Sequence, residues 1–452
     1  MCGILGIYSN KNIGKSLYYG LHSLQHRGQE SCGIAVIDGK NMNCIKGMGL
    51  VTEVFTEKTI KSLNGNVGVA HVRYSTTGEN SKANCQPLSG TCRGKNIALV
   101  HNGNLVNADY LRRTLEEEGY MFQTTSDTEI ILYILAKYYR NSLVEAVKLT
   151  MDYIKGAYSL VIMSEDELVA VRDSHGFRPL MLGRKDDEYI IASESSAIDI
   201  IGGQVIRDIE PGEIIRIKNG ELIVDEYNKI YKEKKSMCIF EYVYFSRNDA
   251  EMDGISTYNF RVNSGKILAK KDNVNADIVI PVPDSGWAGA IGYSSESGIP
   301  LMEGLVKNRY IGRTFIKPTQ EEREIAVKLK LNPLSSVVKD KSIVLIDDSI
   351  VRGTTSKQII DSLRKAGAKE IHMRITSSPV AYPCYFGIDT PRRSKLIAAN
   401  NTVDEINNAI GSTTLKFLDE KGMLEATGHE DVFCLACFNG NYPISPMKKE
   451  EQ

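Results

Sequence analysis

The stretch VLIDDSIVRGTTSKQ combines two carboxylates with a run of small polar residues. Asp347 and Asp348 follow an apolar run at the carboxyl end of an expected strand, where open parallel sheets bind ligands. The residues after them open a helix, whose N–H groups and dipole favour phosphate. For the two acids alone, an acidic cap on a strand-to-helix turn is the alternative. We expect a site for a sugar phosphate, with the candidate residues Asp347, Asp348, Ser349, Arg352, Gly353, Thr354, Thr355 and Ser356.

Two further stretches in the second half carry groups that suit phosphate binding. PVPDSG, residues 281–286, ends another apolar run and offers Asp284 and Ser285. By itself, such a sequence is more typical of a turn. KNRYIGRTFIKPTQEER, residues 307–323, is basic and aromatic without periodicity, too irregular for a core element and compatible with a solvated loop.

Together these stretches resemble the phosphoribosyl pyrophosphate signature of type I phosphoribosyltransferases. The resemblance implies that Asp347 and Asp348 bind the ribose hydroxyls or Mg²⁺, with Ser285 as a further Mg²⁺ ligand. It also implies that residues 352–356 surround the 5'-phosphate and that the 281–286 loop faces the pyrophosphate. The 307–323 segment would be a mobile lid over the pyrophosphate, with Lys307, Arg309, Lys317 and Gln320 as its candidate contributors.

Cys2 has a different chemistry, because its position would give it two reactive groups. Methionine is removed when a small residue follows it, so we expect Met1 alone to be removed, which leaves Cys2 with a thiol and a free α-amine. An α-amine with a pKa of about 7.7 to 8.0 is partly neutral at physiological pH. It can therefore take the proton of the thiol, directly or through water. By itself, a cysteine at this position is more often incidental.

Three further stretches supply groups that would suit a nucleophilic cysteine and its substrate. Arg73 in HVRYSTTG can hold a carboxylate through two hydrogen bonds. Asn102 and the Gly103 N–H in HNGN can form an oxyanion hole. Asp127 in TSDTE can bind an ammonium group.

With LQHRGQESCGIAV, these stretches resemble the glutamine-hydrolysing domain of N-terminal-nucleophile amidotransferases, over residues 2 to about 230. The resemblance implies a four-layered αββα sandwich. It further implies attack by the Cys2 thiolate on the glutamine amide, a glutamyl thioester, release of ammonia, and hydrolysis to glutamate. Arg73 would bind the α-carboxylate of glutamine and Asp127 its α-ammonium.

The pattern of elements changes along the chain. Up to about residue 220 it is rich in strands, with helices expected at 109–118 and 128–139; Ser126 and Glu129 predict a capping box for the second helix. After VDEYNKIYKEKKSM, apolar strands alternate with helices, which indicates a parallel sheet buried on both faces. We therefore expect two domains: an α+β glutaminase sandwich over 1–235, and an α/β phosphoribosyltransferase domain with a cluster-binding tail over 236–452.

Length and composition agree with two soluble domains. The 452 residues exceed the roughly 250 to 300 that one hydrophobic core serves. A formal net charge of -1 gives no bulk attraction for nucleic acid or an anionic membrane. With no apolar run of membrane-spanning length and no targeting segment, we expect a cytoplasmic protein.

Four of the nine cysteines form a candidate metal site. Cys434 and Cys437 occur in CLAC, while Cys238 and Cys384 stand alone. Zinc, an iron–sulfur cluster, a redox disulfide and plain burial all fit, and spacing does not separate zinc from a cluster. One subgroup of these amidotransferases carries a [4Fe-4S] cluster on cysteines placed in this way, so the resemblance favours the cluster. The remaining thiols, Cys32, Cys44, Cys85 and Cys92, have no motif around them.

The two resemblances together imply an enzyme that releases ammonia from glutamine and transfers it to phosphoribosyl pyrophosphate, opening purine synthesis. They also imply Mg²⁺, inhibition by purine nucleotides, and a homotetramer or dimer. One alternative is another glutamine-dependent enzyme, such as an aminosugar or asparagine synthase, against which the DDSIVRGTTS stretch argues. The other is a regulator that senses phosphoribosyl pyrophosphate without transferring anything.

Overall fold

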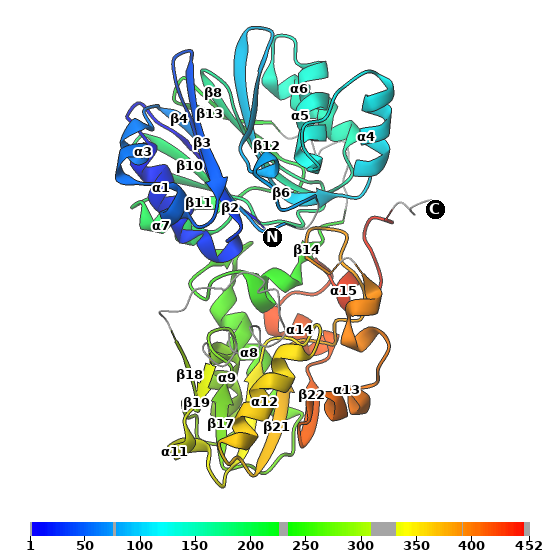
Figure 1. Ribbon diagram of the computed structural model, residues 1–452. Coiled ribbons are helices and arrows are strands. Elements are labelled where there is room, and N and C mark those ends of the chain that lie inside the picture. Colours follow the sequence, from blue (N-terminus) through cyan, green and yellow to red (C-terminus); the bar gives the residue numbers. More distant parts are fainter. Residues whose placement is uncertain (1, 76–77, 226–233, 309–330, 391, 447–452) are drawn as a thin grey trace.

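The computed structural model describes residues 2–75, 78–225, 234–308, 331–390 and 392–446. Figure 1 shows two lobes that follow each other along the chain, with the start of the chain at the junction between them. Within the described residues, no helix has both the length and the apolar character needed to cross a membrane.

The first lobe contains two antiparallel sheets in the part of the chain that the structure describes. The seven-stranded sheet consists of β1 (Gly3–Tyr8), β2 (Ser31–Asp38), β3 (Asn41–Met48), β4 (Val67–Arg73), β9 (Met181–Lys185), β10 (Glu188–Ala192) and β11 (Gln204–Asp208). The six-stranded sheet consists of β5 (Leu88–Cys92), β6 (Lys95–Leu105), β7 (Gly156–Met163), β8 (Glu167–Arg172), β12 (Ile214–Lys218) and β13 (Glu221–Asp225). The orders are β11-β9-β10-β1-β4-β2-β3 and β13-β12-β8-β7-β6-β5.

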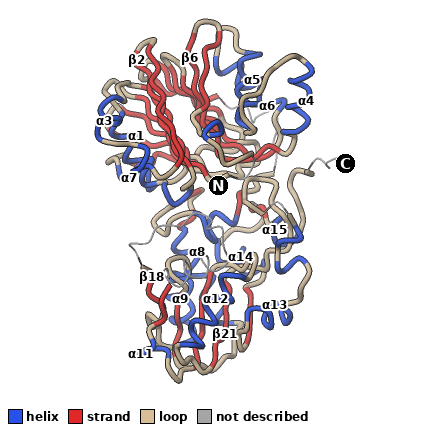
Figure 2. Tube along the Cα trace, viewed as in Figure 1, coloured by secondary structure: helices blue, strands red, loops and turns tan. Residues whose placement is uncertain are grey.

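The two sheets pack face to face, and helices cover their outer faces (Figures 1 and 2). Ile4 and Val69 of the first sheet pack against Val100 and Val161 of the second. The first outer layer holds α1 (Gly14–Ser23), α2 (Val51–Val54), α3 (Glu57–Ser62), α7 (Ser195–Ile200) and the 3-10 turn η1 (Gln25–Arg27). The second holds α4 (Ala108–Glu117), α5 (Asp127–Tyr138) and α6 (Leu143–Tyr153), and the turn η2 (Lys82–Asn84) precedes β5. This arrangement confirms the predicted αββα sandwich.

One local prediction for this lobe is wrong. Ser126 is the N-cap of α5, and its hydroxyl accepts from the Thr128 N–H at 3.3 Å. The Glu129 carboxylate, however, accepts from the N–H groups of Gln123 and Thr124, at 3.0 and 2.8 Å, and does not return to Ser126. The reciprocal capping box is not formed because the preceding loop takes up both oxygens of Glu129.

The second lobe is built on a parallel sheet of four strands within the described residues, in the order β17-β20-β21-β22. Its strands are β17 (Ile278–Pro281), β20 (Ser342–Asp347), β21 (Glu370–Ile375) and β22 (Thr414–Phe417). Its larger helices are α8 (Thr257–Lys270), α9 (Gly286–Ser297), α12 (Thr354–Lys365), α13 (Val403–Ile410) and α14 (Glu420–Thr427). Val344 and Ile346 of β20 pack on the side of α8 and α9, while Ile343 and Leu345 pack on the side of α12. The sheet is therefore buried on both faces, as predicted.

Short elements complete the second lobe and the junction. They are β14 (Met237–Cys238), the single-turn π-helix η4 (Glu241–Phe245), β15 (Glu251–Met252), β16 (Ile255–Ser256), β18 (Leu305–Lys307), β19 (Leu331–Pro333), α11 (Ser335–Val338), η5 (Arg393–Lys395), η6 (Ile397–Ala399), β23 (Phe433–Cys434) and α15 (Ala436–Asn439). At the junction β14 pairs in parallel with β23.

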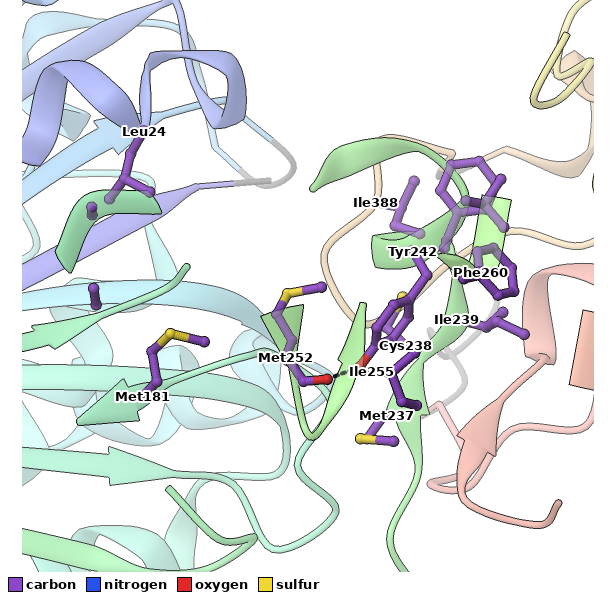
Figure 3. Close-up of a cluster of buried hydrophobic side chains, with 14 of the residues drawn as sticks. Leu24, Met181, Met237, Cys238, Ile239, Tyr242, Met252, Ile255, Phe260 and Ile388 are labelled. Atoms are coloured by element: carbon purple, nitrogen blue, oxygen red, sulfur yellow. Dashed lines mark hydrogen bonds between the residues drawn. The ribbon is translucent and has the colours of Figure 1, made fainter. Parts of the chain in front are cut away.

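One apolar cluster continues from the first lobe into the second (Figure 3). Leu24 and Met181 belong to the first lobe, and Tyr242 and Phe260 to the second. The Tyr242 hydroxyl donates to the Met252 carbonyl oxygen at 3.0 Å, so the polar end of this buried ring is satisfied. The two lobes therefore share a dry core at their junction.

Glycines let the backbones of α8 and α9 touch. A Cβ on Gly265 would lie 2.0 Å from the Gly289 carbonyl oxygen, and a Cβ on Gly292 would lie 1.9 Å from that of Val262. Both obstacles are backbone atoms, so a side-chain rotation cannot relieve the clash.

We predict that Gly265→Ala lowers the free energy of unfolding by about 1 to 3 kcal/mol, because the added methyl forces α8 and α9 apart. In an exposed helix the same change would stabilise by up to about 1 kcal/mol. Gly90→Ala in β5, where a Cβ meets nothing within 4 Å, is the control. Denaturant midpoints measure the effect, and equal midpoints for wild type and Gly265→Ala would contradict the close packing.

Candidate active sites

Strand pairing places Cys2 beside Arg73. Gly3 at the start of β1 lies opposite Val72 near the end of β4. Cys2 and Arg73, which flank this pair, are therefore neighbours at the ends of the two strands. The Cys2 side chain is buried, and its thiol donates to the Tyr74 carbonyl oxygen at 3.7 Å. The nucleophile predicted from the sequence is therefore held on a central strand.

Asn102 reaches Cys2 from the other sheet. Its Oδ1 accepts from the Cys2 nitrogen at 3.2 Å, while its buried Nδ2 has no hydrogen-bond partner among the described residues. A buried donor without a partner costs stability, and it can be satisfied by an oxyanion that forms near Cys2. Gly103 follows on β6, where a Cβ would lie 2.0 Å from the Ala157 carbonyl oxygen, so only glycine fits there.

Arg73 and Asp127 are both buried at the same site. Arg73 donates to the Glu79 carbonyl oxygen at 3.2 Å. Asp127 accepts from the Leu105 N–H at 3.0 Å, and its Oδ1 lies 3.7 Å from Nδ1 of His101. Burial raises the pKa of Asp127, but the charge of His101 and the hydrogen bonds more than offset this, so the pKa lies below its ordinary value. The carboxylate therefore remains ionised, as an ammonium partner should.

Two residues of this site were missed by the sequence analysis, although both lie in stretches quoted there. His101 is buried beside Asp127; burial lowers its pKa, but the Asp127 carboxylate outweighs burial and raises it. Arg27 is buried and donates from Nε to the Cys2 carbonyl oxygen at 2.8 Å. The only sequence signal for these two residues was their position: His101 directly precedes Asn102, and Arg27 lies in the QHRG run.

In the second lobe, sheet topology brings two of the predicted stretches together. Pro281 pairs with Ile346, and the Val282 N–H donates to the Ile346 carbonyl oxygen at 2.8 Å. The loop that carries Asp284 and Ser285 therefore lies beside the end of β20. Gly286 is required there, because a Cβ would lie 2.5 Å from the Ile346 carbonyl oxygen.

The two acids at the end of β20 are buried against each other. The Asp348 N–H donates to Asp347 Oδ1 at 2.9 Å, and the Ser349 hydroxyl donates to Asp348 Oδ1 at 2.5 Å. Burial and the charge of Asp348 hold the pKa of Asp347 well above its ordinary value. Burial also raises the pKa of Asp348, although Ser285, Ser349 and Arg261 oppose the rise. Such a pair suits hydroxyl donors or a divalent cation.

The start of α12 completes this edge. Gly353 is its N-cap with φ 75°, a left-handed conformation that favours glycine. Thr354 and Thr355 are exposed in the first turn, where backbone N–H groups lack partners within the helix, and Ser356 is buried. Arg352 is exposed just before the helix.

Of the four candidate lid contributors, only Lys307 lies in the described part of the chain. Lys307 at the end of β18 forms an ion pair with Asp284. The other candidates of this segment, Arg309, Lys317 and Gln320, lie outside the described residues. Thr376, which the sequence analysis missed, is buried and donates its N–H to the Asp347 carbonyl oxygen at 3.0 Å.

Four cysteines gather at the junction of the lobes. Cys238, Cys384, Cys434 and Cys437 line one cavity together with Phe177, Phe386 and other apolar side chains. All four are free thiols; burial and neighbouring thiols raise the pKa of Cys434 and Cys437, and burial raises that of Cys238 to about 11. Among the described residues, no three His, Cys, Asp or Glu side chains converge closely enough for a single metal ion. The other cysteines of the chain do not line this cavity.

Fold and sites together define a two-domain transferase that depends on glutamine. Residues 71–199 match the glutamine amidotransferase domain family, and residues 259–377 match the phosphoribosyl transferase domain family. The amidophosphoribosyltransferase of Methanocaldococcus jannaschii is 50% identical, with 98% of each chain covered, and that of Bacillus subtilis is 44% identical, with 98% of this chain and 94% of the relative covered. The chain therefore belongs to the amidophosphoribosyltransferase family. These enzymes are glutamine-dependent pentosyltransferases that catalyse the first step of de novo purine biosynthesis.

Solved structures agree with this assignment. The glutamine phosphoribosylpyrophosphate amidotransferase of B. subtilis, complexed with ADP and GMP, matches with a TM-score of 0.93 and 43% identity over 99% of this chain and 98% of that one. A structure described as the allosteric regulatory enzyme of purine biosynthesis matches with a TM-score of 0.94 and 44% identity over 99% and 97%. The family matches leave residues 200–258 unassigned, so the domain boundary near residue 235 stays a prediction.

Proposed function

We propose that Cys2 hydrolyses glutamine and that the carboxyl edge around β20 is the acceptor site for the ammonia. The observation that carries the proposal is the bonding of Asn102, whose Oδ1 holds the Cys2 nitrogen while its Nδ2 is buried without a partner among the described residues. Such a donor beside a terminal thiol suits an acyl-transfer site.

In the first half-reaction the Cys2 thiolate attacks the glutamine amide, and its own α-amine takes the thiol proton. Asn102 Nδ2 and the Gly103 N–H stabilise the oxyanion of the tetrahedral intermediate. The α-ammonium of Cys2 returns this proton to the amide nitrogen, so that ammonia leaves as the thioester forms, and water then hydrolyses the thioester to glutamate. Arg73 binds the α-carboxylate of the substrate and Asp127 its α-ammonium.

In the second half-reaction ammonia attacks the anomeric carbon of phosphoribosyl pyrophosphate, and pyrophosphate leaves. Asp347 and Asp348 bind the ribose hydroxyls, and the first turn of α12 binds the 5'-phosphate through its free N–H groups. The 281–286 loop and Lys307 face the pyrophosphate. The products are 5-phosphoribosylamine, glutamate and pyrophosphate.

Mg²⁺ suits the oxygen ligands at this edge. Asp347, Asp348 and Ser285 supply two carboxylates and a hydroxyl, and Mg²⁺ prefers few protein oxygens with water and phosphate as its other ligands. Bound there, the ion would neutralise charge on the pyrophosphate.

A [4Fe-4S] cluster suits the cysteine cavity better than zinc does. Zinc would need its thiolates about 2.3 Å from one centre. The four thiols surround a cavity without converging in this way, which fits a larger group with one thiolate at each of four corners. Since Cys238 and Cys434 lie opposite each other on β14 and β23, the cluster would hold the end of the chain to the junction.

Regulation, assembly and location complete the proposal. Because the B. subtilis relative was solved with ADP and GMP, we expect purine nucleotides to inhibit this enzyme. We expect a homotetramer or dimer, which the exposed apolar side chains of Ile200 at the end of α7 and of Val205 and Ile206 on the edge strand β11 would suit. We expect the enzyme to be cytoplasmic.

Cys2→Ser should abolish glutamine-dependent synthesis and leave ammonia-dependent synthesis, because the thiol is needed only to release ammonia. Pyrophosphate release with each nitrogen source measures both activities. A parallel loss of both would show that Cys2 does not serve glutamine hydrolysis alone.

Asp347→Asn with Asp348→Asn should weaken binding of phosphoribosyl pyrophosphate about 10- to 100-fold, because charged hydrogen bonds to the ribose are lost. Some glutaminase turnover should remain. Asp361→Asn, an exposed position on α12, is the control. Titration calorimetry with and without Mg²⁺ gives the affinities, and unchanged binding in the double variant would remove both acids from the site.

Cys434→Ser should lower the iron content and yield poorly soluble protein, because the end of the chain loses its anchor. Cys92→Ser, outside the cavity, is the matched control. Iron, sulfide and zinc analysis after anaerobic purification tests this. A wild-type iron content in Cys434→Ser would exclude Cys434 as a ligand. Zinc without iron in the wild-type protein would show that the cavity holds a zinc site and no cluster.

A further inference from the structure

Four buried charged side chains connect the nucleophile of the first lobe to the second lobe. They are Arg27, Arg178, Glu194 and Glu241, and none is more than 2% exposed. Two guanidinium groups face two carboxylates, so the charges of the quartet balance. Because buried charges are costly unless they are paired and hydrogen-bonded, this arrangement restricts the positions of all four groups.

Arg27 is the centre of the quartet. Its Nε donates to the Cys2 carbonyl oxygen at 2.8 Å, and its Nη1 donates to Glu194 Oε1 at 2.5 Å. Its Nη2 contacts both oxygens of Glu241, at 2.9 and 3.0 Å. The planar guanidinium is therefore fixed on three sides, and one of those sides is the backbone of the nucleophile.

Glu241 comes from the second half of the chain, 214 positions away from Arg27. It also accepts from Arg178 Nη1 at 3.3 Å, and Arg178 donates from Nε to the Phe386 carbonyl oxygen at 3.0 Å. Without the negative charge of Glu241, the buried guanidinium groups of Arg27 and Arg178 would have only the Glu194 carboxylate to balance them.

The π-helix η4, which begins at Glu241, is also held from the other side. Arg261 on α8 donates from Nε to the Tyr242 carbonyl oxygen and from Nη2 to that of Ser246, both at 2.8 Å. The positive charge of Arg261 acts on Asp348 of the acceptor site. Turns of this kind are rare and are frequently found at functional sites. One segment of five residues thus lies between the two active sites.

We propose that Glu241, a residue of the second lobe, is a positioning residue for glutamine hydrolysis in the first. Through Arg27 it fixes the Cys2 carbonyl, and with it the thiol and the terminal amine, so the nucleophile is correctly placed only while η4 is docked. The inference rests on the proposed role of Cys2. A displacement of the nucleophile by about 1 Å is enough to slow a reaction roughly 100-fold.

The test compares Glu241→Gln, which removes the charge and keeps the shape, with Glu241→Asp, which keeps the charge. The matched control is Asp253→Asn, which breaks a second buried ion pair between the lobes, that of Arg172 Nη2 with Asp253 at 2.8 Å. Arg172 donates to the Arg178 carbonyl oxygen, but neither Arg172 nor Asp253 has a described hydrogen bond to Cys2 or Arg27. Glutamine-dependent and ammonia-dependent synthesis are measured for each protein, with kcat and KM for glutamine and the rate of Cys2 alkylation by iodoacetamide.

For Glu241→Gln we expect the glutamine-dependent kcat to fall about 10- to 100-fold and alkylation of Cys2 to change, while ammonia-dependent synthesis stays within about twofold. Glu241→Asp should recover part of the loss, and Asp253→Asn should keep the wild-type ratio of the two activities. An unchanged ratio in Glu241→Gln, or the same shift in Asp253→Asn, would overturn the proposal.

Two further arms keep the result interpretable. If Glu241→Gln does not fold, Glu241→Asp decides, because its shorter side chain must still lower the ratio of glutamine-dependent to ammonia-dependent synthesis; an unchanged ratio rejects the role. Cys2→Ser is assayed beside both variants. Residual glutamine hydrolysis in Cys2→Ser would refute the role of Cys2 itself, which is a different outcome from an inert Glu241.

Discussion

The hydrogen bonding of β1 between β10 and β4 is the constraint on which the first active site depends. A strand in the middle of a sheet is fixed along both edges, so the residue that precedes Gly3 has little freedom. The groups proposed to act on glutamine are then brought toward this fixed point from other elements: Arg73 from the neighbouring strand, Asn102 from the opposite sheet, and Asp127 from the start of α5. Of these, Asn102 contacts Cys2 directly, through its Oδ1.

Both candidate sites keep polar groups that are costly in the folded chain. Asn102 has a buried donor without a partner among the described residues, and burial together with the charge of Asp348 raises the cost of ionising Asp347 at the end of β20. Such groups weaken the fold slightly and prepare the site for charge that arrives with the substrate. The quartet around Arg27 differs, because its charges balance within the protein and its effect is rigidity.

The sequence predicted the parts of the fold whose pattern is strong over a short stretch. The long apolar strands and the helices α4, α5 and α12 fall into this class. It missed edge strands such as β3 and β13, whose side chains are half exposed and show little apolar pattern, and α1, which glycine and tyrosine residues make irregular. The candidate site residues named from the sequence could be identified because each lies in a short motif. The contact of Arg27 with Glu241 could not be predicted, since no local pattern relates residues so far apart along the chain.

The pairing of β14 with β23 has a consequence for how the chain is made. β14 is synthesised midway, yet its partner strand is among the last described elements to leave the ribosome. The first lobe can form its two sheets early, because all their strands precede residue 226. The junction, with η4 between the two active sites, can close only near the end of translation. An incomplete chain would therefore carry a folded glutaminase sandwich whose junction has not yet been assembled.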